Sequence, residues 1–240
     1  MPLPPPDPYD GALLVDKPPG PTSHDVVDRV RRRFGIRKVG HAGTLDPNAT
    51  GLLVLLLGRG TRLSEKLMAA DKLYEGTLKL GETTDTYDAD GVVTATAPVP
   101  PLTLEDLNAA AAAFEGDLMQ APPMVSAAKV GGVPLYKLAR KGLEVERKPR
   151  LVHVYSFRFS AYQEPLAAFR VKCTKGTYVR SLVHDLGQKL GCGAHLATLR
   201  RLASGPLKVE DALPLETVLA LSPAELQQRV IPFIQLATAA

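Results

Sequence analysis

The chain has 240 residues, of which 45% are hydrophobic and 22% are charged, and it carries a net charge of +4. These values are typical of globular proteins and exclude a largely disordered chain. The longest apolar run, residues 52–57, is too short to span a bilayer, and the proline-rich residues 1–10 lack the basic and apolar regions of a signal peptide, so we expect no membrane contact and a cytoplasmic location.

The elements expected in chain order surround a glycine-rich loop, residues 40–51. Thr22 or Ser23 is expected to cap a helix that Gly35 ends, and the loop follows that helix. Residues 52–57 then form a continuous apolar run bounded by glycines, which predicts a strand buried on both faces. Further strands are expected at 73–81, 92–96, 151–159 and 166–174, and further helices at 61–70, from Thr103 to near Gly116, at 181–190 and within 209–221.

Strands and helices alternate without the regular spacing of a doubly wound parallel sheet. We therefore predict an α+β fold in which a mixed, mostly antiparallel sheet is flanked by helices and long loops. Residues 122–150 interrupt this pattern with prolines, paired glycines and basic side chains, and we interpret them as a mobile flap.

Basic residues gather in three clusters, which favours a polyanionic partner over the alternative of solvated helix faces. The clusters are Arg29, Arg31, Arg32, Arg33, Arg37 and Lys38; Arg140, Lys141, Arg147, Lys148 and Arg150; and Lys172, Lys175, Arg180, Lys189, Arg200 and Arg201. The acidic loop at residues 85–91 lacks the final glutamate of a calcium-binding loop, so we expect it to orient basic side chains.

The glycine-rich loop contains one carboxylate, Asp46, whose backbone is restricted by Pro47. Beside a guanidinium such as Arg180, a carboxylate can act as a nucleophile or an electrostatic stabiliser, and the alternative is that Asp46 only caps a turn. Tyr74 and Tyr178 either pack in the core or stack on a nucleobase.

Other kinds of chemistry find little support in the sequence. Its five histidines are scattered, its two cysteines are too few for a metal site, and it lacks phosphate-loop, dinucleotide and serine-hydrolase motifs. We therefore expect a reaction that uses no metal or organic cofactor.

Seven stretches resemble the TruB family of tRNA pseudouridine synthases: residues 11–18, 40–51, 71–74, 81–91, 126–129, 175–180 and 191–202. The resemblance implies isomerisation of uridine to pseudouridine at position 55 in the TΨC loop of tRNA, by base flipping and without a cofactor. It implies that Asp46 is the catalytic aspartate, that Arg180 pairs with it, and that Tyr74 stacks on the flipped base and helps late proton removal.

The resemblance also implies RNA contacts. His41 would hold the T loop, Leu199 would line the pocket, and the flap would fold onto the RNA. Further expected contacts with substrate or phosphate are Lys17, Arg62, Lys129 and Tyr178. A catalytic domain at 11–215 and a short extension at 216–240 are expected, without the PUA-type domain that many relatives carry, and a monomer is the default state.

Several alternatives stay open. Asp46 could attack C1′ of the ribose or C6 of the base, or act through elimination. A non-catalytic tRNA-folding module would use the same basic faces and could coexist with the enzyme. A carboxylate glycosidase is a third hypothesis, weakened because no second catalytic carboxylate is evident near Asp46 in the sequence.

Overall fold

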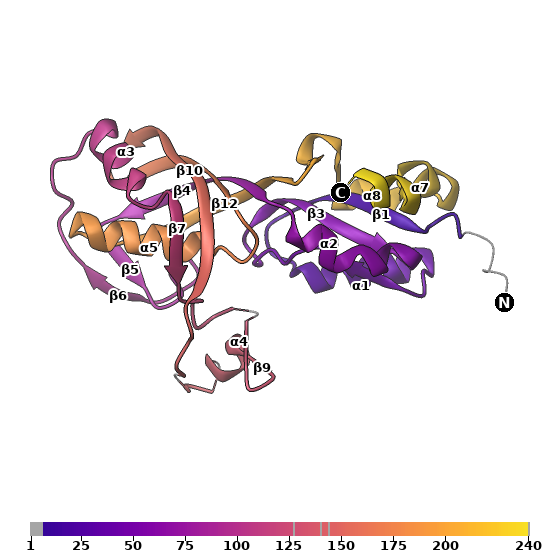
Figure 1. Cartoon of the computed structure of the whole chain (residues 1–240), viewed down its shortest axis with the longest axis horizontal. Coiled ribbons are helices and arrows are strands. Elements are labelled where there is room, and N and C mark those ends of the chain that lie inside the picture. The colour runs from indigo at the N-terminus through magenta and orange to yellow at the C-terminus, as the bar shows by residue number, and fades with distance from the viewer. Residues whose placement is uncertain (1–6, 127, 140, 144, 240) are drawn as a thin grey trace. The chain divides into compact units, whose positions relative to one another are not determined.

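A computed structural model describes residues 7–126, 128–139, 141–143 and 145–239, apart from the side chains of Lys129 and Ala239 (Figure 1). Most of the expected disordered tail, residues 1–10, lies outside this range. The chain forms two compact units and passes between them after Tyr74 and after Leu199. Asp46 lies in the first unit and Arg180 in the second, and each unit is described by itself below.

Two antiparallel strands, β1 (Gly11–Lys17) and β3 (Thr50–Leu57), form the centre of the first unit. The short strand β2 (Val39–His41) pairs with β3, and β14 (Leu213–Pro214) and β15 (Ile231–Pro232) both pair with β1. The end of β12 (Ala194–Ser204) runs parallel to the start of β3 and continues into a turn to β13 (Leu207–Lys208). Residues 52–57 have no exposed surface, which confirms the strand predicted to be buried on both faces.

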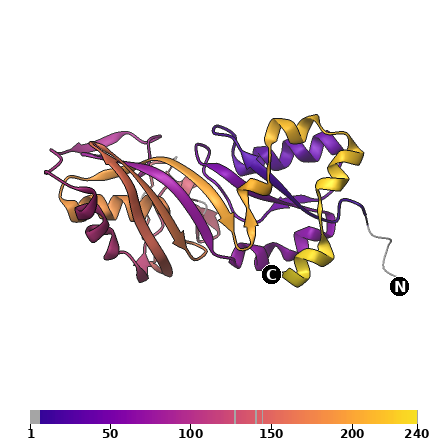
Figure 2. The same cartoon turned by 90° about the horizontal axis from the view of Figure 1, so that it is seen from above.

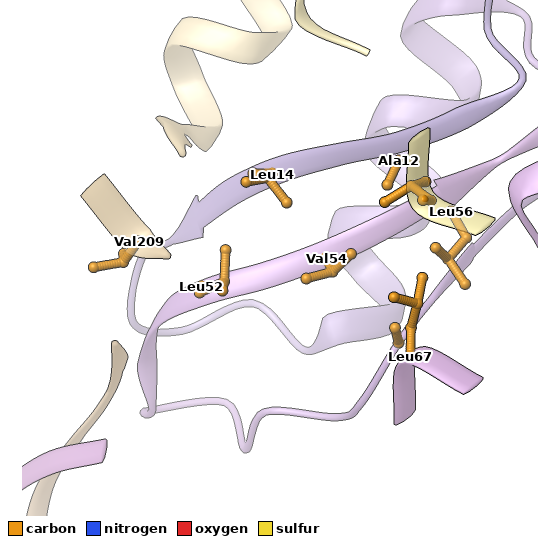
Figure 3. Packing of buried hydrophobic residues seen from close by; sticks show 9 residues of the cluster. Ala12, Leu14, Leu52, Val54, Leu56, Leu67 and Val209 are labelled. Atoms are coloured by element: carbon orange, nitrogen blue, oxygen red, sulfur yellow. The ribbon is translucent and has the colours of Figure 1, made fainter. Parts of the chain in front are cut away.

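Helices cover these strands. On one face, residues of β1 and β3 pack with Leu67 of α2 (Ser64–Ala69) and with Val209 (Figure 3). Helix α1 (Ser23–Phe34) begins with the predicted cap at Thr22 and ends at Gly35, whose φ of 64° suits glycine. Of the remaining helical segments, α6 (Leu215–Ala220) and α8 (Phe233–Ala239) contact β1 (Figure 2). The others are η1 (Gly58–Leu63), η2 (Val209–Asp211) and α7 (Pro223–Arg229).

The second unit is a sheet with two main helices. Its strand order is β12, β4 (Lys72–Leu80), β11 (Leu166–Cys173), β10 (Arg150–Gln163) and β7 (Gly116–Gln120). Helix α3 (Leu104–Ala112) packs on β10, and α5 (Val179–Leu190) packs on α3. The hairpin of β5 (Glu82–Thr84) and β6 (Val93–Thr96) precedes α3, and three phenylalanine rings on β10 and β11 form an edge-to-face cluster.

The expected flap lies between β7 and β10, whose Gln120 and Arg150 are paired. It contains β8 (Lys129–Val130), β9 (Val133–Pro134) and α4 (Leu135–Ala139). Apolar side chains from α4 and β8 share a cavity of about 460 Å³ with Arg147, Lys148 and Arg150. Glu146 also lines this cavity, so basic side chains outnumber acidic ones there by three to one.

The mixed, mostly antiparallel sheet flanked by helices confirms the predicted fold class. Several boundaries differ from the prediction, and strand β12 was not predicted. Helix α3 ends at Ala112 because the chain turns into the unpredicted strand β7 at Gly116, and the segment expected to be helical at 61–70 begins as a tighter helix at Gly58. Within the described ranges, every helix is too short or too polar to cross a membrane.

Candidate active site

Asp46 lies half-buried in the glycine-rich loop between β2 and β3. Backbone hydrogen bonds fix the path of this loop. The amide of Ala42 donates to Val54 O at 2.9 Å, that of Ala49 donates to Asp46 O at 3.1 Å, and that of Gly20 donates to Pro47 O at 2.9 Å. The carboxylate is therefore attached to a backbone of defined shape.

A buried ammonium group lies next to this loop. The Nζ atom of Lys17 donates to the carbonyl oxygens of Pro18 at 2.9 Å, Pro47 at 2.7 Å and Ala49 at 2.8 Å, and Lys17 has no exposed surface. Burial lowers the pKa of Lys17 to about 8, and the negative charge of Asp46 acts against this shift. The expectation that Lys17 contacts phosphate is corrected, because all three of its N–H groups are used within the protein.

A buried guanidinium holds the same loop. Arg201 is 1% exposed, and its Nε donates to Leu52 O at 2.7 Å. Its Nη atoms donate to Gly43 O at 3.1 Å and Thr44 O at 3.4 Å. The sequence groups Arg201 with a basic cluster expected to meet a polyanion, whereas in the structure it lies inside the first unit.

Leu45, the residue before Asp46, is hydrogen-bonded to Ser23 in the first turn of α1. The Oγ atom of Ser23 donates to Leu45 O at 3.0 Å and accepts from Leu45 N at 2.8 Å, and Ser23 is 2% exposed. One buried hydroxyl thus satisfies both backbone groups of Leu45. The sequence suggested Ser23 only as a helix cap, a role that Thr22 takes.

Gly51 allows the close approach of β3 and β12 at the end of the loop. Its φ of 94° is unfavourable for other residues, and a Cβ atom there would overlap the backbone of Arg201. Because Arg201 then reaches Gly43, Thr44 and Leu52, this glycine helps to place the guanidinium.

The other expected residues of the first unit lie on three elements. His41 ends β2, and its Nδ1 is buried without a hydrogen-bond partner among the described residues. Burial and the charge of Arg201 lower the pKa of His41, which favours its neutral form. Arg62 is exposed on η1, and Tyr74 is half-buried on β4.

In the second unit, Arg180 lies in the first turn of α5 and is 4% exposed. Its Nη1 donates to Thr86 O at 2.9 Å and lies 3.1 Å from Oδ2 of Asp88, and its Nη2 donates to Val125 O at 2.7 Å. These contacts confirm that the acidic loop at 85–91 orients a basic side chain. Asp88 itself was not singled out in the sequence.

Tyr178 and Leu199 are both half-buried in this unit. The side chain of Gln120 hydrogen-bonds both backbone groups of Tyr178. Its Oε1 accepts from Tyr178 N at 2.6 Å, and its Nε2 donates to Tyr178 O at 3.1 Å. Sequence analysis missed Gln120 because β7 was not predicted. The side chain of Lys129 lies outside the described part of the structure.

The chemistry that this arrangement supports is carboxylate chemistry. In the first unit, a fixed carboxylate interacts with a buried ammonium, a combination that suits a nucleophile or a stabiliser of positive charge. Among the described residues, the acidic, histidine and cysteine side chains form no group of three or more that could hold a metal ion. Both cysteines are free and buried.

The fold is similar to that of chains in two assemblies of known structure. A chain in the crystal structure of a Cbf5-Nop10-Gar1 complex matches with a TM-score of 0.74 and 29% identity, covering 94% of this chain and 60% of that one. A chain in the structure of an H/ACA RNP bound to a substrate RNA containing 2'-deoxyuridine matches with a TM-score of 0.69 and 27% identity, covering 93% and 59%. The present chain thus spans about three fifths of each.

Family comparison defines the class as pseudouridylate synthase. Residues 31–179 match the TruB family pseudouridylate synthase (N terminal domain), and residues 180–234 match the tRNA pseudouridylate synthase B C-terminal domain. The chain therefore belongs to the TruB family of pseudouridylate synthases.

Curated relatives agree with this assignment. The tRNA pseudouridine synthase B of Opitutus terrae is 57% identical over 228 residues, which cover 95% of both chains. The protein of the same name from Syntrophotalea carbinolica is 50% identical over 216 residues, which cover 90% of this chain and 71% of that one.

Proposed function

We propose that this pseudouridylate synthase isomerises uridine to pseudouridine at position 55 in the TΨC loop of tRNA. Family membership and the names of the curated relatives support tRNA as the substrate. The observation that carries the proposal is the placement of Asp46 in a loop held by Lys17, Ser23 and Arg201. Such a loop presents one carboxylate in one position before substrate arrives.

The reaction breaks the N-glycosidic bond of uridine, rotates the base and forms a bond from ribose C1′ to base C5. C5 then loses its hydrogen as a proton, and N1 gains a proton. The Asp46 carboxylate attacks ribose C1′ or base C6, or removes a proton in an elimination route. Each route needs a carboxylate with a fixed orientation, and the charge of Lys17 stabilises the negative charge of Asp46. Fixing the loop in advance lowers the reorganisation that the reaction requires.

A uridine in the folded T loop must leave the stack before it reacts, which costs a few kcal/mol. Stacking and polar contacts must offset that cost. In the proposed reaction Tyr74 stacks on the flipped base and assists late proton removal, and Arg180 pairs with Asp46. The other proposed substrate contacts are His41, Tyr178, Leu199, Lys129 and Arg62.

The remaining parts of the proposal concern the RNA as a whole. The basic cavity of the flap, with Arg147, Lys148 and Arg150, contacts backbone phosphates of the T arm. A monomer in the cytoplasm carries out the reaction without a cofactor.

The test is tritium release from tRNA labelled at C5 of its uridines, because bond formation at C5 expels that hydrogen. We expect release from wild-type tRNA and none from tRNA carrying cytidine at position 55 and labelled at its other uridines. Equal release from both RNAs would overturn the assignment to position 55. Binding of tRNA without any release would instead favour an RNA-folding module.

A further inference from the structure

A turn in the second unit contains a strained residue. Tyr87 has a φ of 64°, and it is the one residue other than glycine with a positive φ in the described ranges. The left-handed conformation is unfavourable for a tyrosine. This turn carries two of the groups that hold Arg180, namely the carbonyl of Thr86 and the carboxylate of Asp88.

The ring of Tyr87 lies flat on the ring of His184. Their centroids are 3.8 Å apart and their planes differ by 16°. His184 lies one helical turn after Arg180 on α5, so both side chains point from the same face of the helix. The turn therefore meets the helix at two adjacent points, the guanidinium of Arg180 and the imidazole of His184.

The imidazole is suited to stacking. Its Nδ1 is buried and lacks a hydrogen-bond partner among the residues that the structure describes. Burial lowers the pKa of His184, so the neutral ring is favoured at neutral pH. The contact of His184 with Tyr87 is therefore a contact between two uncharged rings.

The backbone of the turn is also tied to β12. The amide of Leu196 donates to Tyr87 O at 3.0 Å, and the amide of Ala89 donates to Leu196 O at 3.0 Å. These bonds fix the turn relative to the strand. The stack is a contact between side chains of the turn and of α5, in addition to the contacts of Arg180 with Thr86 and Asp88.

We propose that the stack of Tyr87 on His184 is a positioning device for Arg180. It holds the turn of residues 86–88 against α5, so that Thr86 and Asp88 fix the direction of the guanidinium. Tyr87 and His184 are thus positioning residues and do not touch the reacting atoms. The inference rests on the role proposed above for Arg180.

The variants Tyr87→Ala and His184→Ala test this device by removing the stack. We expect kcat for tRNA to fall about tenfold in each with KM within about twofold of wild type, because RNA contacts remain. The double variant should be no slower than either single variant, since one contact is lost in all three. Tyr87→Phe and His184→Phe keep two stacked rings and should stay within about twofold of wild type.

Tyr87→Gly separates stacking from backbone strain. Glycine adopts the positive φ without cost but has no ring, so we expect slow turnover with unchanged or higher thermal stability. Wild-type kcat in Tyr87→Gly or in both alanine variants would overturn the proposal. Slow phenylalanine variants, or alanine effects that add in the double variant, would also overturn it.

Two further measurements separate this proposal from the function on which it rests. Arg180→Lys should be slow, and a wild-type rate in that variant would overturn the role of Arg180 and the positioning device together. If Arg180→Lys is slow but the stack variants are not, only the device is overturned.

Independently of activity, the Arg180 Nε–H signal in nitrogen-15 spectra should be sharp in wild type and Tyr87→Phe and broadened in Tyr87→Ala. Identical signals in these proteins would contradict the device.

Discussion

Lys17 shows how burial decides what a charged residue does. Its ammonium group satisfies three carbonyl oxygens of the loop and of the turn after β1, with no surface left for RNA. Its pKa of about 8 lies below the ordinary 10.5, so the folded protein releases this proton before the unfolded chain does. Between these two pH values the unfolded chain binds more protons, and Lys17 therefore adds stability as pH rises.

We predict that turnover and this stability contribution move in opposite directions above pH 8. Turnover should fall as Lys17 loses its charge, because the loop loses the cation next to Asp46. The unfolding free energy of wild type, measured relative to Lys17→Met by urea unfolding at several pH values, should rise over the same range. If the difference in unfolding free energy between wild type and Lys17→Met did not change between pH 7 and 10, Lys17 would keep its proton throughout that range.

Residue roles could be predicted only in part. A single sequence does not show whether a lysine or arginine is buried, so Lys17 and Arg201 were both assigned to the surface. The acidic loop was interpreted correctly because it fails as a calcium site and lies in a chain rich in basic residues, and Asp88 does pair with Arg180.

At the level of elements, the start of α1 has two adjacent hydroxyls with separate tasks. Thr22 caps the helix, whereas Ser23 holds Leu45 of the glycine-rich loop. Thr22→Ala should cost about 1 kcal/mol of stability with normal kcat. Ser23→Ala should cost about 1–3 kcal/mol, because it leaves buried backbone groups unpaired, and should also lower kcat about tenfold. Equal kcat in the two variants would contradict the role given to Ser23.

Gly51 allows β3 to approach β12, and Gly116 on β7 serves as a control position for testing this. Their φ angles are 94° and 90°, but a Cβ would overlap Arg201 only at Gly51. Both alanine variants carry the cost of a positive φ, about 1–3 kcal/mol. We expect Gly51→Ala to lose about 2 kcal/mol more than Gly116→Ala in urea unfolding, through the added overlap. Similar losses of stability in the two variants would show that β12 can shift away from an added Cβ atom at Gly51.

Helices and buried strands followed from the sequence because their signals are local. The capping boxes at Thr22 and Thr103 and the apolar run of β3 each lie within a few residues. Strand β7 was missed because its five residues do not alternate clearly and its pairing partner on β10 lies beyond the flap. Pairing over that distance is not visible in a local pattern.

At the level of the whole molecule, the interleaved elements predicted the mixed sheet but not its division. Strands β4 and β12 each contribute residues to both compact units. The sequence pattern predicts β4 as one strand and does not predict β12, so neither segment shows where one unit ends. That boundary depends on long-range pairing, which composition and spacing do not encode.

The flap can be removed at its base to test RNA binding. Because Gln120 and Arg150 are paired, an Asn-Gly turn can replace residues 121–149 and close a hairpin. We expect the shortened protein to keep its circular dichroism spectrum and to bind tRNA more weakly. Its affinity should also depend less steeply on salt, since phosphate contacts of Arg147 and Lys148 are lost. Unchanged affinity and slope would contradict a role of the flap in binding RNA.

The central claim is that Asp46 is the reacting group of a tRNA pseudouridine synthase, and the most direct measurement is single-turnover tritium release by Asp46→Asn. The control is Asp28→Asn, which removes a carboxylate from weak ion pairs on α1. We predict that Asp46→Asn binds tRNA within about threefold of wild type but releases tritium at least about 1,000-fold more slowly, while Asp28→Asn behaves as wild type. Release by Asp46→Asn at a rate near that of wild type would contradict the account.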